Sequence, residues 1–246
     1  MPKFVINRIK DFSSYGLSIA DDAGVCTILF CNIEDFEKIC EVCGSEVVKV
    51  LDQLFRNFDS LCEKYGLQKI ETQGKTYMAA GGLDFVETQI PEELEKINVT
   101  VRAINLALEM QKCGGGYKIQ DGLKINLKIG IHRGTCMMGI IGYHKPQFSL
   151  IGDTINTSAR HCAMGKPGNV MVSVQAWQHS GITNEIPYQV VDKFMKGKGT
   201  LPVYFIAADL RGFKTILLDA IGHLDNLEKS KAQQCTTCLS PAEIQA

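Results

Sequence analysis

Residues 124–131 alternate strictly between apolar and other side chains, and this pattern restricts the possible folds more than any other feature. Isoleucine or leucine stands at positions 125, 127, 129 and 131, whereas lysine, asparagine and glycine stand between them. A period of two is that of a β-strand with one buried face. The chain must therefore form a sheet that other elements cover on one side.

Three segments have the spacing of amphipathic helices that can cover such a sheet. Residues 47–62 place apolar side chains three and four positions apart, which predicts the first helix. A second helix is predicted at about 100–112, where the triple glycine 114–116 ends it, and a third at about 153–163. Residues 91–98 are predicted to form a charged loop.

Short β-rich runs complete the predicted body, and two of them flank Gly74 as a hairpin. The order strand–helix–strand–strand–helix–strand, with a mostly antiparallel sheet, predicts an α/β fold of the ferredoxin-like sandwich type. We expect a lead-in at 1–21, one domain at 22–208, and a helical and polar tail at 209–246 that contains the amphipathic stretch 216–227. The predicted strands are 25–31, 69–72, 76–80, 125–131, 170–173, 188–191 and 203–207, with a further apolar run at 136–141.

The balance of charges and the length of the apolar runs exclude several classes of protein. The 26 Lys and Arg residues face 27 Asp and Glu residues, so no basic field favours nucleic acid. No apolar run is long enough to cross a bilayer, and the first 21 residues lack the layout of a signal peptide. We therefore expect a soluble, intracellular (cytoplasmic) protein without direct membrane insertion.

The cysteines do not predict a metal or disulfide framework. Ten cysteines are too few for a disulfide scaffold of this length. The two CxxC pairs, Cys40/Cys43 and Cys235/Cys238, lie too far apart in the chain for the usual structural zinc spacing. Free thiols are the better prediction.

Three segments together resemble the catalytic domain of the class III adenylyl and guanylyl cyclases. They are VCTILFCNIEDF at 25–36, KIETQGKTYMAAGGL at 69–83, and IGIHRG at 129–134, which is followed by PQFSLIGDTINTSAR at 146–160. The resemblance covers about residues 22–208. It implies that a ribose 3′-hydroxyl attacks the α-phosphorus of a nucleoside triphosphate, with two metal ions and aligned side chains stabilising the charge.

In this family the domains act as head-to-tail dimers, and one partner holds the metal ions with two aspartates. This chain departs from that pattern, because Asn32 stands at the first aspartate position and Lys75 at the second. Magnesium prefers carboxylate oxygen to an amide, and an ammonium repels it. Glu34 and Asp35 leave the backbone in other directions and are not expected to substitute. We expect no metal site in this chain, so that Mg²⁺ or Mn²⁺ is held by a partner.

The resemblance implies that the other half of the site is retained. Asn156 and Arg160 match the family's Asn-x-x-x-Arg pattern, in which the asparagine orients the ribose and the arginine stabilises the developing phosphoryl charge. Four residues apart on a helix, they share one face. Lys196 and Lys198 match a loop whose lysine reaches the terminal phosphates in some members, although lysines between glycines also occur in ordinary solvated turns.

The residues at the base-reading positions favour GTP over ATP. Guanine-selective members carry Glu where this chain has Glu71, and usually Cys where it has Ser149. The carboxylate can accept from guanine N1–H and N2–H, and the hydroxyl can donate to O6.

Three functions remain open from the sequence, of which the third is GTP sensing without catalysis. In the first, the chain is the metal-poor half of a heterodimeric guanylyl cyclase, a phosphorus–oxygen lyase inactive alone, whose metal-bearing partner is a second cyclase domain. In the second, it is an inactive cyclase-fold module that serves dimerisation or scaffolding in a larger assembly.

Overall fold

The computed structural model describes residues 20–117, 119, 122–142, 144, 146–182 and 186–207. The chain divides into two units, Met1–Asp209 and Leu210–Ala246, and every described residue belongs to the first. The strands are β1 (Ala20–Ile33), β2 (Gln68–Gln73), β3 (Thr76–Gly81), β4 (Leu127–Ile141), β5 (Gln147–Ile151), β6 (Asn169–Ser173), β7 (Tyr188–Met195) and β8 (Gly199–Ala207). The helices are α2 (Phe36–Cys43), the 3₁₀ turn η1 (Gly44–Glu46), α3 (Val47–Lys64), α4 (Asp84–Glu87), α5 (Glu92–Glu95), α6 (Val99–Gly116), α7 (Asp153–Met164) and α8 (Val174–Ser180).

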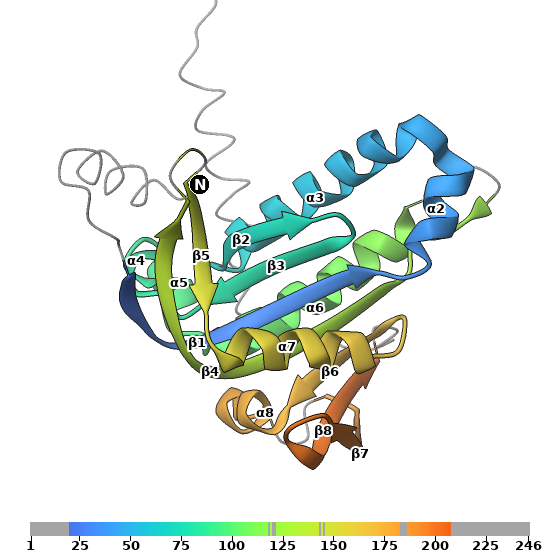
Figure 1. Cartoon of the computed structure of the whole chain (residues 1–246). Helices are drawn as coiled ribbons and strands as arrows, with labels where there is room; N and C mark the ends of the chain where they lie inside the picture. The colour runs from blue at the N-terminus through green and yellow to red at the C-terminus, as the bar shows by residue number, and fades with distance from the viewer. Residues whose placement is uncertain are drawn as a thin grey trace, which may run out of the picture. The chain divides into compact units, whose positions relative to one another are not determined.

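The strands form one sheet in the order β2-β3-β1-β4-β6-β8-β7, and β5 pairs with β4 outside this path (Figure 1). The strands β4 and β6 run parallel, whereas the other neighbouring strands in the described part run antiparallel. The first four strands lie in the sheet in the order β2-β3-β1-β4, with α3 between β1 and β2 along the chain and α6 between β3 and β4. This combination of strand order and helix connections is that of the ferredoxin-like fold. The predicted ferredoxin-like α/β sandwich is confirmed, with β5 to β8 as its extension.

Helices cover both faces of the central strands, although the alternation at 124–131 predicts only one buried face. Leu127 of β4 packs under α6, since a Cβ on Gly114 would lie 2.9 Å from its Cδ1 atom. Gly130 points to the opposite face, where a Cβ would lie 2.2 Å from the backbone nitrogen of Cys162 in α7. Figure 1 shows α6 and α7 on opposite sides of β1 and β4. Glycine allows α7 to approach at backbone distance, so no large apolar residue signals this second buried face.

Several predicted boundaries differ from the structure. The helix predicted at 100–112 continues as α6 through the triple glycine to Gly116, because Gly114 packs against Leu127 without space for a side chain. The predicted loop 91–98 contains the single helical turn α5. The strand predicted at 125–131 begins only at Leu127, and it continues through the apolar run 136–141 as one strand, β4. The sequence analysis did not predict α2, α4, β5 or α8 as elements.

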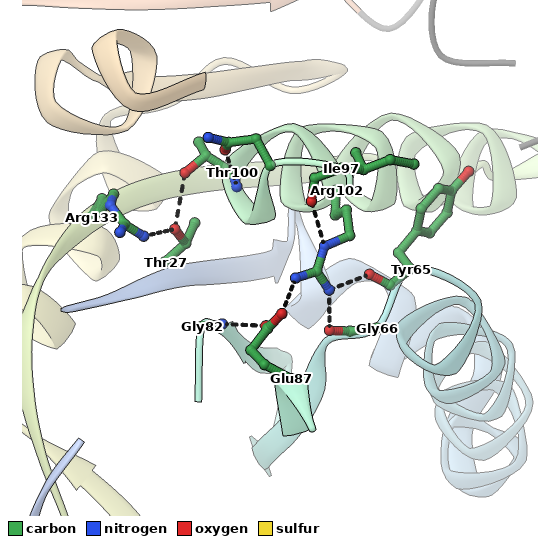
Figure 2. Close-up of polar contacts among 10 residues, drawn as sticks. Thr27, Tyr65, Gly66, Gly82, Glu87, Ile97, Thr100, Arg102 and Arg133 are labelled. Carbon is green, nitrogen blue, oxygen red and sulfur yellow. Dashed lines mark hydrogen bonds and ion pairs between the residues drawn. The ribbon is translucent and has the colours of Figure 1, made fainter. Parts of the chain in front are cut away.

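A buried arginine joins the end of α3 to the start of α6, and sequence reasoning missed it. Arg102 is 1% exposed. Its guanidinium donates to the carbonyls of Tyr65 (3.2 Å), Gly66 (2.7 Å) and Ile97 (3.2 Å), and to Glu87 Oε2 at 2.5 Å (Figure 2). Glu87 in turn accepts from the backbone nitrogen of Gly82. This network satisfies a buried charge and holds the loops between β3 and α6 in place.

Other predictions concern the cysteines, the membrane and the tail. The cysteines in the described residues, Cys40 and Cys43 included, are free thiols. Within the same part of the chain, no helix is long and apolar enough to cross a membrane. The Cys235/Cys238 pair and the amphipathic stretch 216–227 lie outside the described residues, and the domain boundaries at 21 and 208 stay predictions.

Candidate active site

The two positions that correspond to metal aspartates lie side by side at the end of β1. Asn32 pairs with Thr76 of β3, and Thr76 Oγ1 donates to Asn32 Oδ1 at 2.7 Å. The next residue of β1, Ile33, donates its backbone N–H to the carbonyl of Lys75 at 3.1 Å. The fold thus brings Asn32 and Lys75 together, as the resemblance implies, but with an amide and an ammonium in place of two carboxylates.

Two acidic residues near this corner, Glu34 and Glu37, form ion pairs within the chain. Glu34 forms an ion pair with Lys128 at 2.7 Å. Glu37 of α2 forms one with Lys75 at 3.3 Å, and the pKa of Glu37 is lowered by its own backbone N–H and then by this lysine. Asp35 has a left-handed backbone (φ 49°) at the start of α2.

These donors do not fit a pair of divalent cations. The described residues contain no group of three or more His, Cys, Asp or Glu side chains that could hold a metal ion. The amide oxygen of Asn32 already accepts a hydrogen bond, and Lys75 carries a positive charge into the position of the second ligand.

Helix α7 carries Asn156 and Arg160 and is fixed on the sheet by close backbone contacts. The Ser158 hydroxyl shares its one hydrogen between the carbonyls of Ile28 (2.9 Å from Oγ) and Gly130 (3.2 Å from Oγ), which belong to the neighbouring strands β1 and β4. Thr154 Oγ1 donates to the carbonyl of Thr135 at 2.6 Å. These contacts use the buried face of the helix, so Asn156 is left exposed and Arg160 half-exposed on the other face.

The turn between β7 and β8 lies along the exposed face of α7. Arg160 Nη1 donates to the carbonyl of Lys196 at 2.9 Å. Lys198 Nζ forms an ion pair with Asp153, the first residue of α7, and this contact lowers the pKa of Asp153. The structure therefore brings Arg160, Lys196 and Lys198 together, and sequence reasoning missed Asp153, which joins them.

Glu71 and Ser149, to which the resemblance assigns base reading, lie on β2 and β5, and one side-chain hydrogen bond joins these two strands. Gln147 Nε2 donates to Glu71 Oε2 at 3.1 Å. Ser149 lies two residues further along β5 and so shares the face of Gln147, while Phe148 and Leu150 are buried. A shift of register between Lys69 and Glu71 marks a bulge, a feature that re-aims side chains. Sequence reasoning missed Gln147, which orients the carboxylate.

Two buried histidines lie beneath the exposed face of α7. His132 of β4 and His161 of α7 stack with ring centroids 5.7 Å apart and an interplanar angle of 8°. His132 Nδ1 is 2.8 Å from Ser173 Oγ, and His161 Nδ1 is 2.8 Å from the carbonyl of Thr157. Burial, and then the neighbouring His161, lower the pKa of His132 to about 4; burial also lowers the pKa of His161. Both rings are therefore neutral near pH 7.

The candidate residues fall into two groups in this chain. Strand β5 leads into α7 through Gly152 alone, so Ser149 and Asn156 lie on one continuous segment. Glu71 joins this segment through Gln147, and the Lys196–Lys198 turn joins it through Arg160 and Asp153. Among the contacts of the described residues, no hydrogen bond or ion pair connects Asn32 or Lys75 with this group. The second group thus places the Glu71 carboxylate at one end of the β5–α7 segment and the Lys196–Lys198 turn beside α7.

Comparisons with known proteins show which family the chain resembles. A family model described as the adenylate and guanylate cyclase catalytic domain matches residues 20–208. Guanylate cyclase beta of Plasmodium falciparum is 30% identical over 84% of this chain and 7% of its own length. The human guanylate cyclase soluble subunit beta-2 is 30% identical over 85% of this chain and 32% of its own length. The chain thus spans less than a third of the length of these relatives.

Solved structures show the same likeness. The catalytic core of a rhodopsin-guanylyl cyclase with converted specificity, in complex with ATPalphaS, aligns with a TM-score of 0.67 at 25% identity, over 78% of this chain and 99% of that chain. The guanylate cyclase domain of RhGC from Catenaria anguillulae, in complex with GTP, aligns with a TM-score of 0.66 at 25% identity, over 76% and 98%.

Proposed function

The chain belongs to the adenylate and guanylate cyclase catalytic domain family, and from this premise we propose that it is the metal-poor half of a heterodimeric guanylyl cyclase. One observation carries the proposal: α7 presents Asn156 and Arg160 beside a lysine turn, whereas both metal positions hold side chains that reject Mg²⁺. A metal-bearing cyclase domain supplies what this chain lacks, namely two aspartates and the Mg²⁺ or Mn²⁺ ions that they bind.

In this proposal the residues of this chain bind and align the substrate. Glu71 accepts from guanine N1–H and N2–H, Ser149 donates to O6, and Gln147 holds the Glu71 carboxylate in place. Asn156 orients the ribose. Arg160 stabilises the charge that develops as the 3′-oxygen attacks the α-phosphorus and pyrophosphate leaves, since its fork of donors suits phosphate oxygens. Lys196 and Lys198 bind the terminal phosphates.

The test is reconstitution of cyclase activity with a defined partner. The purified chain alone is expected to form no cyclic nucleotide from GTP with either Mg²⁺ or Mn²⁺, because a homodimer presents Asn32 and Lys75 at both sites. Activity is expected when a cyclase domain that carries both aspartates is added. The matched control is the double variant Asn32→Asp, Lys75→Asp, which supplies two anionic ligands and is expected to gain activity alone wherever its homodimer forms.

Two results would contradict the proposal. Robust turnover by the unmodified chain alone would mean that the metal ions find ligands elsewhere. A formed complex that stays inactive with every aspartate-bearing partner would favour the second function, a catalytically inactive dimerisation or scaffold module. That alternative has an observation of its own, since Asn32 and Lys75 are already satisfied by Thr76 and Glu37 within the chain.

Base preference is tested separately in the active complex. Wild type is expected to prefer GTP, and the double variant Glu71→Lys, Ser149→Asp is expected to shift preference towards ATP, because donors and acceptors that face the base are exchanged. Glu71 and Ser149 are half-buried in the free chain, and once a bound base covers them, leaving one unpaired costs about 1–3 kcal/mol, or about 5- to 150-fold in kcat/KM. Steady-state rates with both nucleotides measure this, and a wild-type preference for ATP would refute the base assignment.

A further inference from the structure

On the exposed face of α7, the carboxylate of Asp153 pairs with Lys198, one of the two lysines that we assign to the substrate phosphates. Asp153, Asn156 and Arg160 stand at positions i, i+3 and i+7, so they lie along one face of the helix over about 10 Å. The turn of Lys196–Lys198 runs beside this face and is attached at both ends. Arg160 binds the carbonyl of Lys196, and Asp153 binds the ammonium of Lys198.

The ammonium of Lys198 cannot bind a substrate phosphate while it is paired with Asp153. The side chain of Lys198 is 28% exposed and directs its ammonium to Asp153 Oδ2. Asp153 also accepts from Thr157 Oγ1 at 3.3 Å, which orients its carboxylate. A terminal phosphate that approaches Lys198 must therefore displace a carboxylate that offers the ammonium the same kind of acceptor, an anionic oxygen.

The ion pair between Asp153 and Lys198 is weak enough to open and close reversibly. The side chain of Asp153 is 67% exposed, so water replaces the lysine readily when the pair opens. As the first residue of an α-helix, Asp153 is also stabilised as an anion by the helix dipole. An ion pair this exposed changes an equilibrium by up to about fivefold. A triphosphate with several anionic oxygens can outcompete it.

We infer that Asp153 is an internal competitor of the substrate's terminal phosphates for Lys198, and so is a residue that tunes nucleotide affinity and pyrophosphate release. This inference rests on the proposed function. The pair is closed in the free chain, opens when the triphosphate binds, and closes again as pyrophosphate leaves. Asp153 does not touch the reacting atoms. It acts through Lys198, which distinguishes it from Asn156 and Arg160.

The experiment uses the full chain in complex with an aspartate-bearing cyclase partner. Asp153→Asn keeps an oxygen that can accept from Thr157 but removes the charge that competes for Lys198. The variant is expected to lower the KM for GTP by about two- to fivefold without raising kcat, and to strengthen inhibition by added pyrophosphate by the same factor. Calorimetric titration with pyrophosphate checks the affinity independently of turnover, and a thermal melt checks that the variant is folded.

Three further variants separate competition from a general charge effect. Asp153→Glu can retain the pair and is expected to behave as wild type. Asp192→Asn removes an equal charge from an exposed position of strand β7 and is expected to leave both the KM for GTP and the affinity for pyrophosphate unchanged. In a Lys198→Ala background, the Asp153→Asn change is expected to have no further effect, because the lysine over which the two anions compete is gone.

The outcomes distinguish this inference from the proposed function. An active wild-type complex in which Asp153→Asn leaves KM and pyrophosphate affinity unchanged overturns the competition and leaves the proposed function standing. A raised KM in Asp153→Asn also overturns it, since Asp153 would then align Lys198 for the substrate. A wild-type complex that neither binds nor converts GTP overturns both.

Discussion

One carbon added at Gly130 is expected to have a large effect on stability that can be worked out from the structure. A Cβ there would lie 2.2 Å from the backbone nitrogen of Cys162 and 2.7 Å from its Cα. Both are backbone atoms of α7, so no side-chain rotation can relieve the overlap. Gly130→Ala must therefore move the helix away from the sheet by about 1 Å to reach ordinary contact distance.

The cost follows from the contacts that this movement breaks. Overpacking of a closed core costs about 1–3 kcal/mol. The shift also weakens the one hydrogen bond that the Ser158 hydroxyl shares between the carbonyls of Ile28 and Gly130, at about 1 kcal/mol. The sum is about 2–4 kcal/mol, or a fall in Tm of about 10 °C for a domain of this size. Because α7 carries Asn156 and Arg160, a displacement of about 1 Å is also expected to cost about 10²-fold in the rate of the reconstituted complex.

The assay is chemical and thermal unfolding of the chain, with Gly115→Ala as the matched control. Gly115 is an exposed residue of α6, and a Cβ added to it would meet nothing within 4 Å, so alanine there is expected to be neutral or to stabilise by up to about 1 kcal/mol. If Gly130→Ala unfolded at the same denaturant concentration as wild type, the close approach of α7 to β4 would be refuted.

Three other perturbations test separate parts of the structure. Arg102→Leu leaves the largely buried Glu87 without its cation, and urea titrations are expected to show a free energy of unfolding lower by about 3–5 kcal/mol. A loss below about 1 kcal/mol would contradict the network around Arg102. The pKa of His132 is about 4 in the folded chain and 6.5 in the unfolded chain, so the unfolded chain binds more protons between these pH values. The free energy of unfolding is therefore expected to fall as the pH drops from 6.5 to 4, by up to about 1.4 kcal/mol per pH unit. The His132→Gln variant is expected to show a less steep fall. Arg160→Ala in the reconstituted complex is expected to lower kcat by about 10²–10³-fold with a smaller change in KM, and steady-state kinetics that show no change would mean that Arg160 only holds the turn.

Local patterns in the sequence determined the central elements and their types. The alternation at 124–131, the helical stripe at 47–62 and the glycine-centred hairpin each arise from contacts within a few residues, so periodicity predicts them. The residue types at Asn32 and Lys75 likewise need no coordinates to indicate a poor metal site, because the chemistry of an amide and an ammonium is the same in any fold. The resemblance then predicts which of these positions would contact a nucleotide.

Only the tertiary structure decided which partners those residues have. Nothing in the sequence around Gly130 indicates that α7 packs on it, and Arg102 finds its carboxylate and three carbonyls on segments before it in the chain. Asp153 and Lys198 are separated by 45 residues, as Glu71 and Gln147 are by 76. A sequence specifies such contacts only through the whole fold, because the pairing of distant side chains depends on strand order and register, and neither leaves a periodic signal. The sequence by itself therefore determined the family and the chemical types at the site, whereas the tertiary structure decided that its cations are held by internal anions and carbonyls.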